Sequence, residues 1–186
     1  MMEHSGVRLR KLEPNDIPAL WELHTPAIFE HMLTKVADFK EMEAWLQAGI
    51  GRNDVLSFVV EDTNTGQIIG TTRIALIDRK NKSCEIGSTF YTASVQRSHV
   101  NTVVKGMLLA HCFEELGMIR VQFKTDVENL RSQKALERLG AVKEGVIRNE
   151  RIRSTGKPRD AVLYSIIGRE WPEVKERLLG KMNKYT

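Results

Sequence analysis

The sequence contains few cysteines and no long apolar run. Its 186 residues include only two cysteines, Cys84 and Cys112, which form neither a Cys-x-x-Cys pair nor a zinc-ligand pattern. This argues against a disulfide framework, and we expect reduced structural thiols and no bound metal. No apolar stretch reaches the ~18 residues that a membrane-spanning helix needs, and the first residues lack the apolar core of a signal peptide. We therefore expect a cytoplasmic protein without a membrane partner.

Motifs of several common enzyme classes are also absent. The chain has no Gly-x-Ser-x-Gly elbow, no Gly-x-x-x-x-Gly-Lys-Ser/Thr loop and no Gly-x-Gly-x-x-Gly fingerprint. These absences argue against a hydrolase, a P-loop nucleotidase and a dinucleotide-binding enzyme. His111, Glu114 and Glu115 occur close together but without the His-Glu-x-x-His spacing, so we interpret them as a solvated helix face.

The composition is that of an ordinary globular domain. Apolar residues make up 41% of the chain and charged residues 28%, and a chain of this length can form one core. We predict a domain over 7–168 with a helical tail over 169–186 packed on it. The net charge of +4 favours an anionic partner. Because Lys and Arg are dispersed along the chain, a phosphate-rich small cofactor is favoured over nucleic acid, which we keep as a minor alternative.

The apolar periodicity predicts an alternation of strands and helices. The predicted strands cover 7–12, 56–61, 68–77, 83–91, 121–125, 141–153 and 160–167, and the predicted helices cover 17–32, 38–49, 101–116, 129–139 and 171–181. The order β-α-α-β-β-β-α-β-α-β-β indicates a mixed α/β fold with a largely antiparallel sheet flanked by helices.

The most informative segment joins the fourth predicted strand to the central helix. It runs from Ser83 to Tyr91 and then through Gln96-Arg97-Ser98-His99-Val100-Asn101-Thr102 into the helix. Backbone N–H groups in such a loop, together with the positive end of the helix dipole, form a site for a pyrophosphate. Arg97 adds a direct charge contact.

This segment and the order of elements resemble the GNAT superfamily, in particular its branch similar to the RimJ/RimL ribosomal-protein-alanine N-acetyltransferases. In that family the loop reads Gln/Arg-x-x-Gly-x-Gly/Ala, and the matching positions here are Gln96, His99 and Asn101. The resemblance implies acetyl-CoA as the acyl donor, with its diphosphate bound by Gln96, Arg97, Ser98, His99, Val100, Asn101 and Thr102. Because glycine permits close approach and positive φ, His99 and Asn101 are expected to bring side chains into a cradle that still binds the cofactor.

A second family signature follows the fifth predicted strand. Asn129-x-x-Ser132, then Leu136 and Gly140, resembles the family pattern Asn-x-x-Ser/Ala followed by Leu/Tyr-x-x-x-Gly. The resemblance implies that Asn129 and Ser132 contact the pantetheine arm or the sulfur. Many relatives carry a tyrosine at the Leu136 position that protonates the leaving thiolate. Leucine cannot, which leaves Ser132, Tyr91 or water as the proton source.

The resemblance also implies the remaining catalytic parts. Glu85 matches the strand glutamate that several relatives use as a general base, and the backbone of Thr89, Phe90 and Tyr91 would hydrogen-bond pantetheine and polarise the thioester carbonyl. The sheet is expected to splay between its fourth and fifth predicted strands to admit pantetheine. Simpler interpretations stay open, because a strand glutamate is often salt-bridged and Asn129 with Ser132 is also ordinary helix-capping chemistry.

Rings on the first two predicted helices have two interpretations. Trp21, His24, Phe29 and Trp45 line an acceptor pocket or belong to the core, and aromatic residues at helical spacing favour the core.

The sequence therefore predicts an N-acetyltransferase that moves an acetyl group from acetyl-CoA to a primary amine by direct attack. The acceptor is a protein N-terminus or a small-molecule amine, and a homodimer is kept open. The alternative is a non-catalytic module of the same fold that binds CoA or another metabolite.

Overall fold

An eight-stranded sheet forms the centre of the computed structural model, which describes residues 1–29, 36–153 and 156–185. The strands lie in the order β1-β2-β3-β4-β5-β6-β8-β7, and only the β5–β6 pair is parallel. Their bounds are β1 Met2–His4, β2 Val7–Lys11, β3 Leu56–Asp62, β4 Ile68–Asp78, β5 Ser83–Tyr91, β6 Arg120–Asp126, β7 Val142–Ile152 and β8 Pro158–Ile167. The mixed, largely antiparallel α/β architecture is confirmed.

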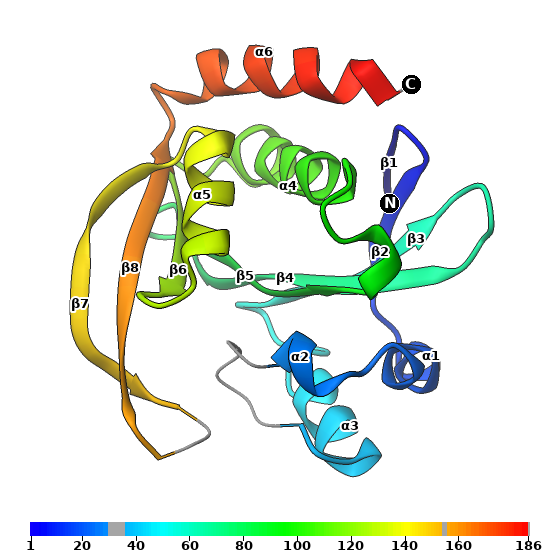
Figure 1. Ribbon diagram of the computed structural model, residues 1–186. Helices are drawn as coiled ribbons and strands as arrows, with labels where there is room; N and C mark the ends of the chain where they lie inside the picture. The colour runs from blue at the N-terminus through cyan, green and yellow to red at the C-terminus, as the bar shows by residue number, and fades with distance from the viewer. Residues whose placement is uncertain (30–35, 154–155, 186) are drawn as a thin grey trace.

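Helices cover both faces of the sheet (Figure 1). On one face lie α1 Ile17–Glu22, α2 Pro26–Phe29 and α3 Phe39–Gln47, and on the other lie α4 Val100–Ala110, α5 Leu130–Leu139 and α6 Trp171–Met182. Two of these helices begin with a capping side chain that accepts a hydrogen bond from a first-turn N–H group. Asp38 caps α3 and Asn129 caps α5. No helix of the described residues is long and apolar enough to cross a bilayer.

Each helical layer encloses its own core. The core beneath α4, α5 and α6 includes Leu9, Ile86, Leu108, Tyr164 and Leu178. The smaller core beneath α1–α3 includes Ile17, Leu20, Met42, Leu46 and Phe90. Because α6 contributes Trp171, Val174, Leu178 and Met182 to the first core, it packs as part of the α4 layer.

Three details differ from the sequence prediction. Residues 2–4, which precede the predicted domain of 7–168, form a strand: Met2–His4 pairs with β2 through a two-residue turn in which Ser5 and Gly6 both have positive φ, at 45° and 77°. The single helix predicted over 17–32 is divided into α1 and α2, since Pro26 disfavours helical geometry at the residue before it; residues 30–32 lie outside the described residues. The central helix becomes π-helical over His111–Glu115.

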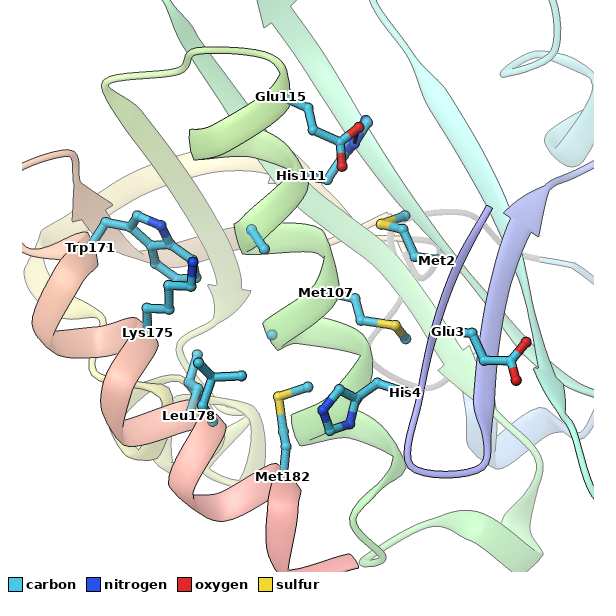
Figure 2. Close-up of a pocket in the computed structure, with 13 residues that line it drawn as sticks. Met2, Glu3, His4, Met107, His111, Glu115, Trp171, Lys175, Leu178 and Met182 are labelled. Carbon is cyan, nitrogen blue, oxygen red and sulfur yellow. Dashed lines mark ion pairs between the residues drawn. The ribbon is translucent and has the colours of Figure 1, made fainter. Parts of the chain in front are cut away.

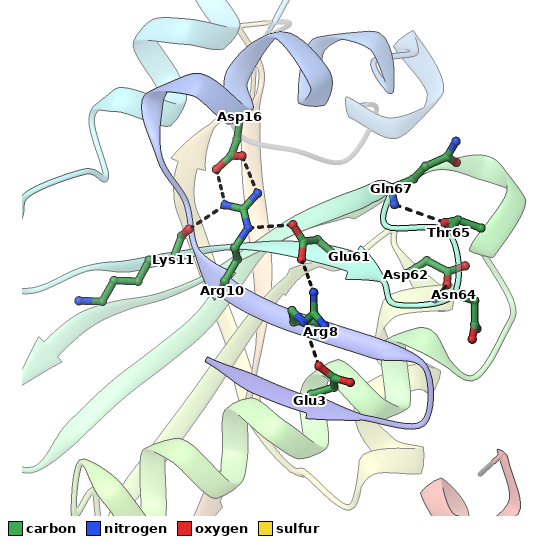
Figure 3. A network of polar contacts seen from close by, with 10 residues as sticks. All are labelled: Glu3, Arg8, Arg10, Lys11, Asp16, Glu61, Asp62, Asn64, Thr65 and Gln67. Carbon is green, nitrogen blue, oxygen red and sulfur yellow. Dashed lines mark hydrogen bonds and ion pairs between the residues drawn. The ribbon is translucent and has the colours of Figure 1, made fainter.

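A polar network fastens β2 to its neighbours (Figure 3). The Arg10 guanidinium donates to both Asp16 oxygens at 2.8 and 2.7 Å and to Glu61 at 2.8 Å. Arg8 lies 2.9 Å from Glu3 and 3.6 Å from Glu61. The bidentate Arg10–Asp16 pair fixes the turn before α1 against the sheet.

Candidate functional site

The two halves of the sheet separate between β5 and β6. These parallel strands share three register pairs, Ser83–Arg120, Cys84–Val121 and Glu85–Gln122, although they continue to Tyr91 and Asp126. Beyond Glu85 the backbone of β5 therefore lacks a strand partner on its β6 side. An extended ligand can add to such an edge through main-chain hydrogen bonds. The strands therefore separate between the fourth and fifth predicted strands, as expected from the resemblance.

A bulge in β5 turns its side chains over at this point. The register with β4 shifts between Thr71 and Arg73, and Ser88 has a φ of 48°. Before the bulge Cys84 and Ile86 belong to the core beneath α4. After it Phe90 belongs to the opposite core, whereas Thr89 and Tyr91 contact α4. The bulge thus gives both faces of the sheet a side chain from the same short segment.

Helix α4 is joined to β5 along its length. Two side-chain contacts link the two elements, Asn101 with Tyr91 (3.2 Å) and Lys105 with Thr89 (2.7 Å), and Cys112 in the π-helical turn after α4 contacts Cys84 of β5 (3.6 Å). The Tyr91 hydroxyl donates to the Asn101 amide oxygen, and burial raises the Tyr91 pKa well above its usual range. Tyr91 therefore keeps its proton and is a poor acid.

Lys105 is a buried cation that the sequence analysis missed. Its side chain lies among apolar α4 residues, the residue is 6% exposed, and burial lowers its pKa to about 7. Its ammonium donates to the Thr89 hydroxyl, which also lies 2.7 Å from the Thr72 hydroxyl. A lone lysine in the run from Val103 to Leu109 was the available signal.

The loop before α4 is held by its own side chains. Gln96 donates to the Tyr91 carbonyl and accepts from Arg131, both at 3.2 Å. Arg97 has a φ of 64°, and the Ser98 hydroxyl donates to the Val95 carbonyl at 2.6 Å. The left-handed geometry that glycine usually supplies is therefore adopted by Arg97.

The two residues that replace the family glycines contact protein groups. The imidazole of His99 donates to the Ser5 carbonyl in the β1–β2 turn at 3.2 Å, and Asn101 accepts from Tyr91. The His99 side chain is thus directed toward the N-terminal hairpin. This differs from the expectation that it enters the phosphate cradle.

The first turn of α4 faces a polar hollow. The Val100 N–H donates to Ser98 Oγ, while those of Asn101 and Thr102 lie where a helix offers no internal acceptor. A hollow of about 310 Å³ opens here, lined by Asn101, Thr102, Ala135, Arg138, Leu139, Lys181 and Lys184. Helix-end N–H groups and cationic side chains together favour a phosphate-bearing ligand.

Glu85 lies on the opposite face in a network of charges. It accepts from Gln122 at 2.9 Å and lies 3.2 Å from the ammonium of Lys124, which is 3.1 Å from Glu150. The Glu85 side chain is 18% exposed and that of Glu150 is 8% exposed. Burial acts to raise the Glu150 pKa, but the hydrogen bond from Lys124 and the neighbouring cations outweigh it and lower that pKa. Two carboxylates therefore hold one primary ammonium between them.

The family model described as "Acetyltransferase (GNAT) domain" matches residues 7–142. The chain belongs to the GNAT acetyltransferase family. It is an acyl-CoA-dependent N-acetyltransferase, as its relatives' names also indicate.

Relatives of this GNAT protein match nearly its whole length. A provisionally assigned acetyltransferase from T. thermophilus is 33% identical, covers 98% of this chain and 95% of its own, and has a TM-score of 0.87. YdaF of Bacillus subtilis, provisionally named a ribosomal N-acetyltransferase, is 27% identical over 91% of this chain and 94% of its own. That name agrees with the RimJ/RimL resemblance. The fold alone is shared with the spermidine N-acetyltransferase of Vibrio cholerae, solved with CoA and spermine, at 23% identity, a TM-score of 0.78 and coverage of 91% of this chain and 99% of that one.

The second GNAT signature forms a helix cap in this structure. The Asn129 side chain accepts from the Ser132 N–H at 3.0 Å, which satisfies the start of α5. Leu136 is buried in the core beneath α4. The described contacts account for Asn129 as a cap, and its role toward the pantetheine stays a prediction.

The face of the GNAT sheet that carries Glu85 also carries the aromatic residues of α1 and α3. Trp21 stacks on His24 at 4.6 Å between centroids, and Trp45 stacks on Phe90 at 6.2 Å. Arg73, another missed residue, lies 4.6 Å above Trp45 and donates to the Trp45 carbonyl at 2.6 Å, and burial lowers its pKa to about 10. These rings pack against one another as the core interpretation expects; nothing is described of the Phe29 side chain.

A separate, mostly apolar pocket lies across α4 from the splay (Figure 2). Its volume is about 280 Å³, and Figure 2 shows Met2 and His4 of β1, Met107 of α4 and Trp171 and Met182 of α6 around it. No residue of β5 lines this pocket.

Proposed function

We propose that this protein transfers an acetyl group from acetyl-CoA to a primary amine by direct attack of the amine on the thioester. The observation that carries the proposal is the unpartnered edge of β5, which lies beside the first turn of α4 and its basic hollow. Tyr91 of that edge donates to Asn101 of the first turn, so an edge for an extended arm and a helix terminus for a diphosphate adjoin each other.

The donor is proposed to bind along this opening. Pantetheine would add to the β5 edge over Thr89, Phe90 and Tyr91, where the bulge at Ser88 interrupts the regular ladder. The diphosphate would accept from the N–H groups of Asn101 and Thr102. The side-chain bonds of Gln96 and Ser98 support this by holding the loop in place without glycine at positions 99 and 101.

Glu85 is proposed as the general base. An alkylammonium with a pKa of about 10.4 must lose a proton before it can attack. Glu85 already holds the ammonium of Lys124 at 3.2 Å, so its carboxylate is suited to a primary amine. Lys124 keeps Glu150 as a partner at 3.1 Å when Glu85 turns to substrate.

The leaving thiolate needs little assistance. A thiol of pKa about 8.5 leaves readily near neutral pH, and Ser132 at the start of α5 is the proposed side chain that relays a proton from solvent water to the sulfur. Leu136 is apolar and buried, and the raised Tyr91 pKa argues against Tyr91 in this role.

The acceptor is proposed to be a primary amine approached from the α1–α3 face. Glu85 is the carboxylate proposed to meet a cationic substrate on that face, because Glu150 is already paired with Lys124, Arg151 and Arg159. The Vibrio cholerae protein is named for spermidine and YdaF for the ribosome, so polyamines and protein N-terminal peptides are the first candidates. A cytoplasmic location fits the two free, buried cysteines.

Release of the CoA thiol tests the proposal. Purified protein and acetyl-CoA are incubated with polyamines, amino acids and N-terminal peptides, and free thiol is followed with a chromogenic disulfide. We expect amine-dependent release with at least one panel member and stoichiometric acetylated amine by mass spectrometry. Tight acetyl-CoA binding with no thiol release from any primary amine would support the binding module instead.

A further inference from the structure

The basic hollow beside α4 has more positive charge than a diphosphate site on a helix terminus requires. Its cations come from two separate elements: Arg138 from α5, and Lys181 and Lys184 from α6 and the turn after it. Figure 1 shows α6 lying across the layer that α4 and α5 form. The family model matches residues 7–142, so Lys181 and Lys184 lie outside the matched residues.

Among the described residues, these cations have no acidic partner. In the part of the chain that the structure describes, no carboxylate forms an ion pair with Arg138, Lys181 or Lys184. Burial and the charges of Arg177, Arg138 and Lys184 lower the Lys181 pKa, so the like charges repel one another. An anion in the hollow would remove that repulsion.

Helix capping explains only part of this arrangement. Lys181 donates to the Arg138 carbonyl at 2.8 Å, and Arg177 donates to the Leu139 carbonyl at 3.3 Å. These two bonds satisfy the C-terminal end of α5. They leave the guanidinium of Arg138 and the ammonium of Lys184 without a described polar partner, although both residues line the hollow.

We propose that Arg138, Lys181 and Lys184 bind the phosphomonoester on the ribose of coenzyme A and so select the phosphorylated nucleotide. The inference rests on the proposed function, which places the diphosphate at Asn101 and Thr102. Those two residues form one wall of the same hollow. A third phosphate, one ribose away from the diphosphate, would then meet the cations that line the rest of the hollow.

Calorimetric titration with two ligands tests this assignment. Coenzyme A and dephospho-CoA differ only in that phosphate, and we expect wild-type protein to bind coenzyme A at least about tenfold more tightly. Lys184→Gln should weaken coenzyme A severalfold and leave dephospho-CoA unchanged. Lys181→Gln/Lys184→Gln should remove most of the discrimination.

A matched control separates local contacts from net charge. Arg79→Gln/Lys80→Gln removes the same charge from the exposed β4–β5 turn and should change neither affinity. Because Lys181 also caps α5, the single Lys184→Gln variant carries the test if the double variant melts at a lower temperature than wild type.

The outcomes decide the assignment. Equal affinity of the wild-type protein for the two ligands would overturn it. An equal loss of affinity for both ligands in Lys184→Gln would also overturn it, because the cations would then contact the diphosphate. Failure of the proposed donor site is distinct, because neither ligand would then bind wild-type protein, and a loss of catalysis alone would leave both affinities as expected here.

Discussion

The carboxylate of Glu85 is at once the proposed base and one end of an ion pair. Lys124 lies 3.2 Å away and Gln122 donates at 2.9 Å, so the carboxylate has two donors before any substrate arrives. Both donors contact the same oxygen of the carboxylate, Oε2. The contacts therefore suit a base that exchanges one ammonium for another.

Replacing Glu85 by Gln keeps the size of the side chain and removes its charge. We expect kcat/KM for the amine to fall about a hundredfold, since a positioned general base contributes on that order. The KM for acetyl-CoA should stay unchanged, because Glu85 faces away from α4. Steady-state kinetics with the amine found in the panel would measure both.

Glu144→Gln is the control for that substitution. Glu144 pairs with Arg120 at 2.7 Å on β7 and its pKa is lowered to about 2 by Arg120 and Ser165, but it lies outside the proposed site. It should retain wild-type turnover. If Glu85→Gln also kept full turnover from pH 6 to pH 9, Glu85 would not be the base.

Lys105 makes stability depend on pH. Its pKa is about 7 in the folded protein and 10.5 in an ordinary environment. Between those values the unfolded chain binds more protons, so the free energy of unfolding rises with pH from about 7 to about 10.5. Below pH 7 the folded protein carries the full penalty of a buried charge.

Lys105→Met should therefore be more stable than wild type at pH 6, and its advantage should shrink toward pH 9. Urea unfolding at the two pH values measures the free energy of unfolding of each protein. Taking the difference between variant and wild type cancels the contribution of groups that titrate in both. Lys143→Met, on the exposed strand β7, should show no such pH-dependent difference. If Lys105→Met were no more stable than wild type at pH 6, burial of the Lys105 ammonium would not destabilise the fold.

At the scale of elements, the junction of α5 and α6 depends on one glycine. Gly140 ends α5 with a φ of 98°, and a Cβ there would meet the Arg177 guanidinium. Gly140→Ala should lower the free energy of unfolding by about 1–2 kcal/mol or more, from left-handed strain and from the displaced Arg177. Chemical denaturation measures the change.

Gly180→Ala is the same chemical change, but it should raise the free energy of unfolding. Gly180 lies inside α6 with nothing within 4 Å of an added Cβ. Alanine is favoured over glycine in a helix interior by about 0.8–1.0 kcal/mol, so this variant should be more stable than wild type. A loss of stability in Gly180→Ala as large as that in Gly140→Ala would contradict the assignment of the Gly140 effect to its positive φ and to Arg177.

The elements that the sequence predicted poorly are those that local pattern does not specify. Strand β1 has three residues, too few for a periodic signal, and it exists because it pairs with β2. The bulge at Ser88 inverts the alternation within β5, so side-chain direction there depends on pairing with β4. Strands with clear alternation and helices with clear caps were predictable, because local propensity and tertiary packing agree in them.

At the scale of the whole molecule, the site is assembled from segments far apart in the chain. The loop from Gln96 and the strand carrying Glu85 could be predicted because each is a contiguous motif. Lys124 and Glu150 meet Glu85 only through the order of β5, β6, β8 and β7 in the sheet. Lys181 reaches the hollow only because α6 folds back over α4. Such contacts depend on topology, which a single sequence leaves open.

Coenzyme A is expected to join the two halves of the sheet, since β5 and β6 share only three register pairs. At 100 times its dissociation constant it should add ~2.7 kcal/mol to the free energy of unfolding, or about 5–10 °C in melting temperature for a chain of this size. Amide hydrogen exchange should slow at 88–91, at 124–126 and in the first turn of α4, because the ligand lies along those segments. Exchange in β1, beside the apolar pocket, should stay unchanged. Slowing in β1 without slowing at 88–91 would place the ligand in that pocket and contradict the proposed site.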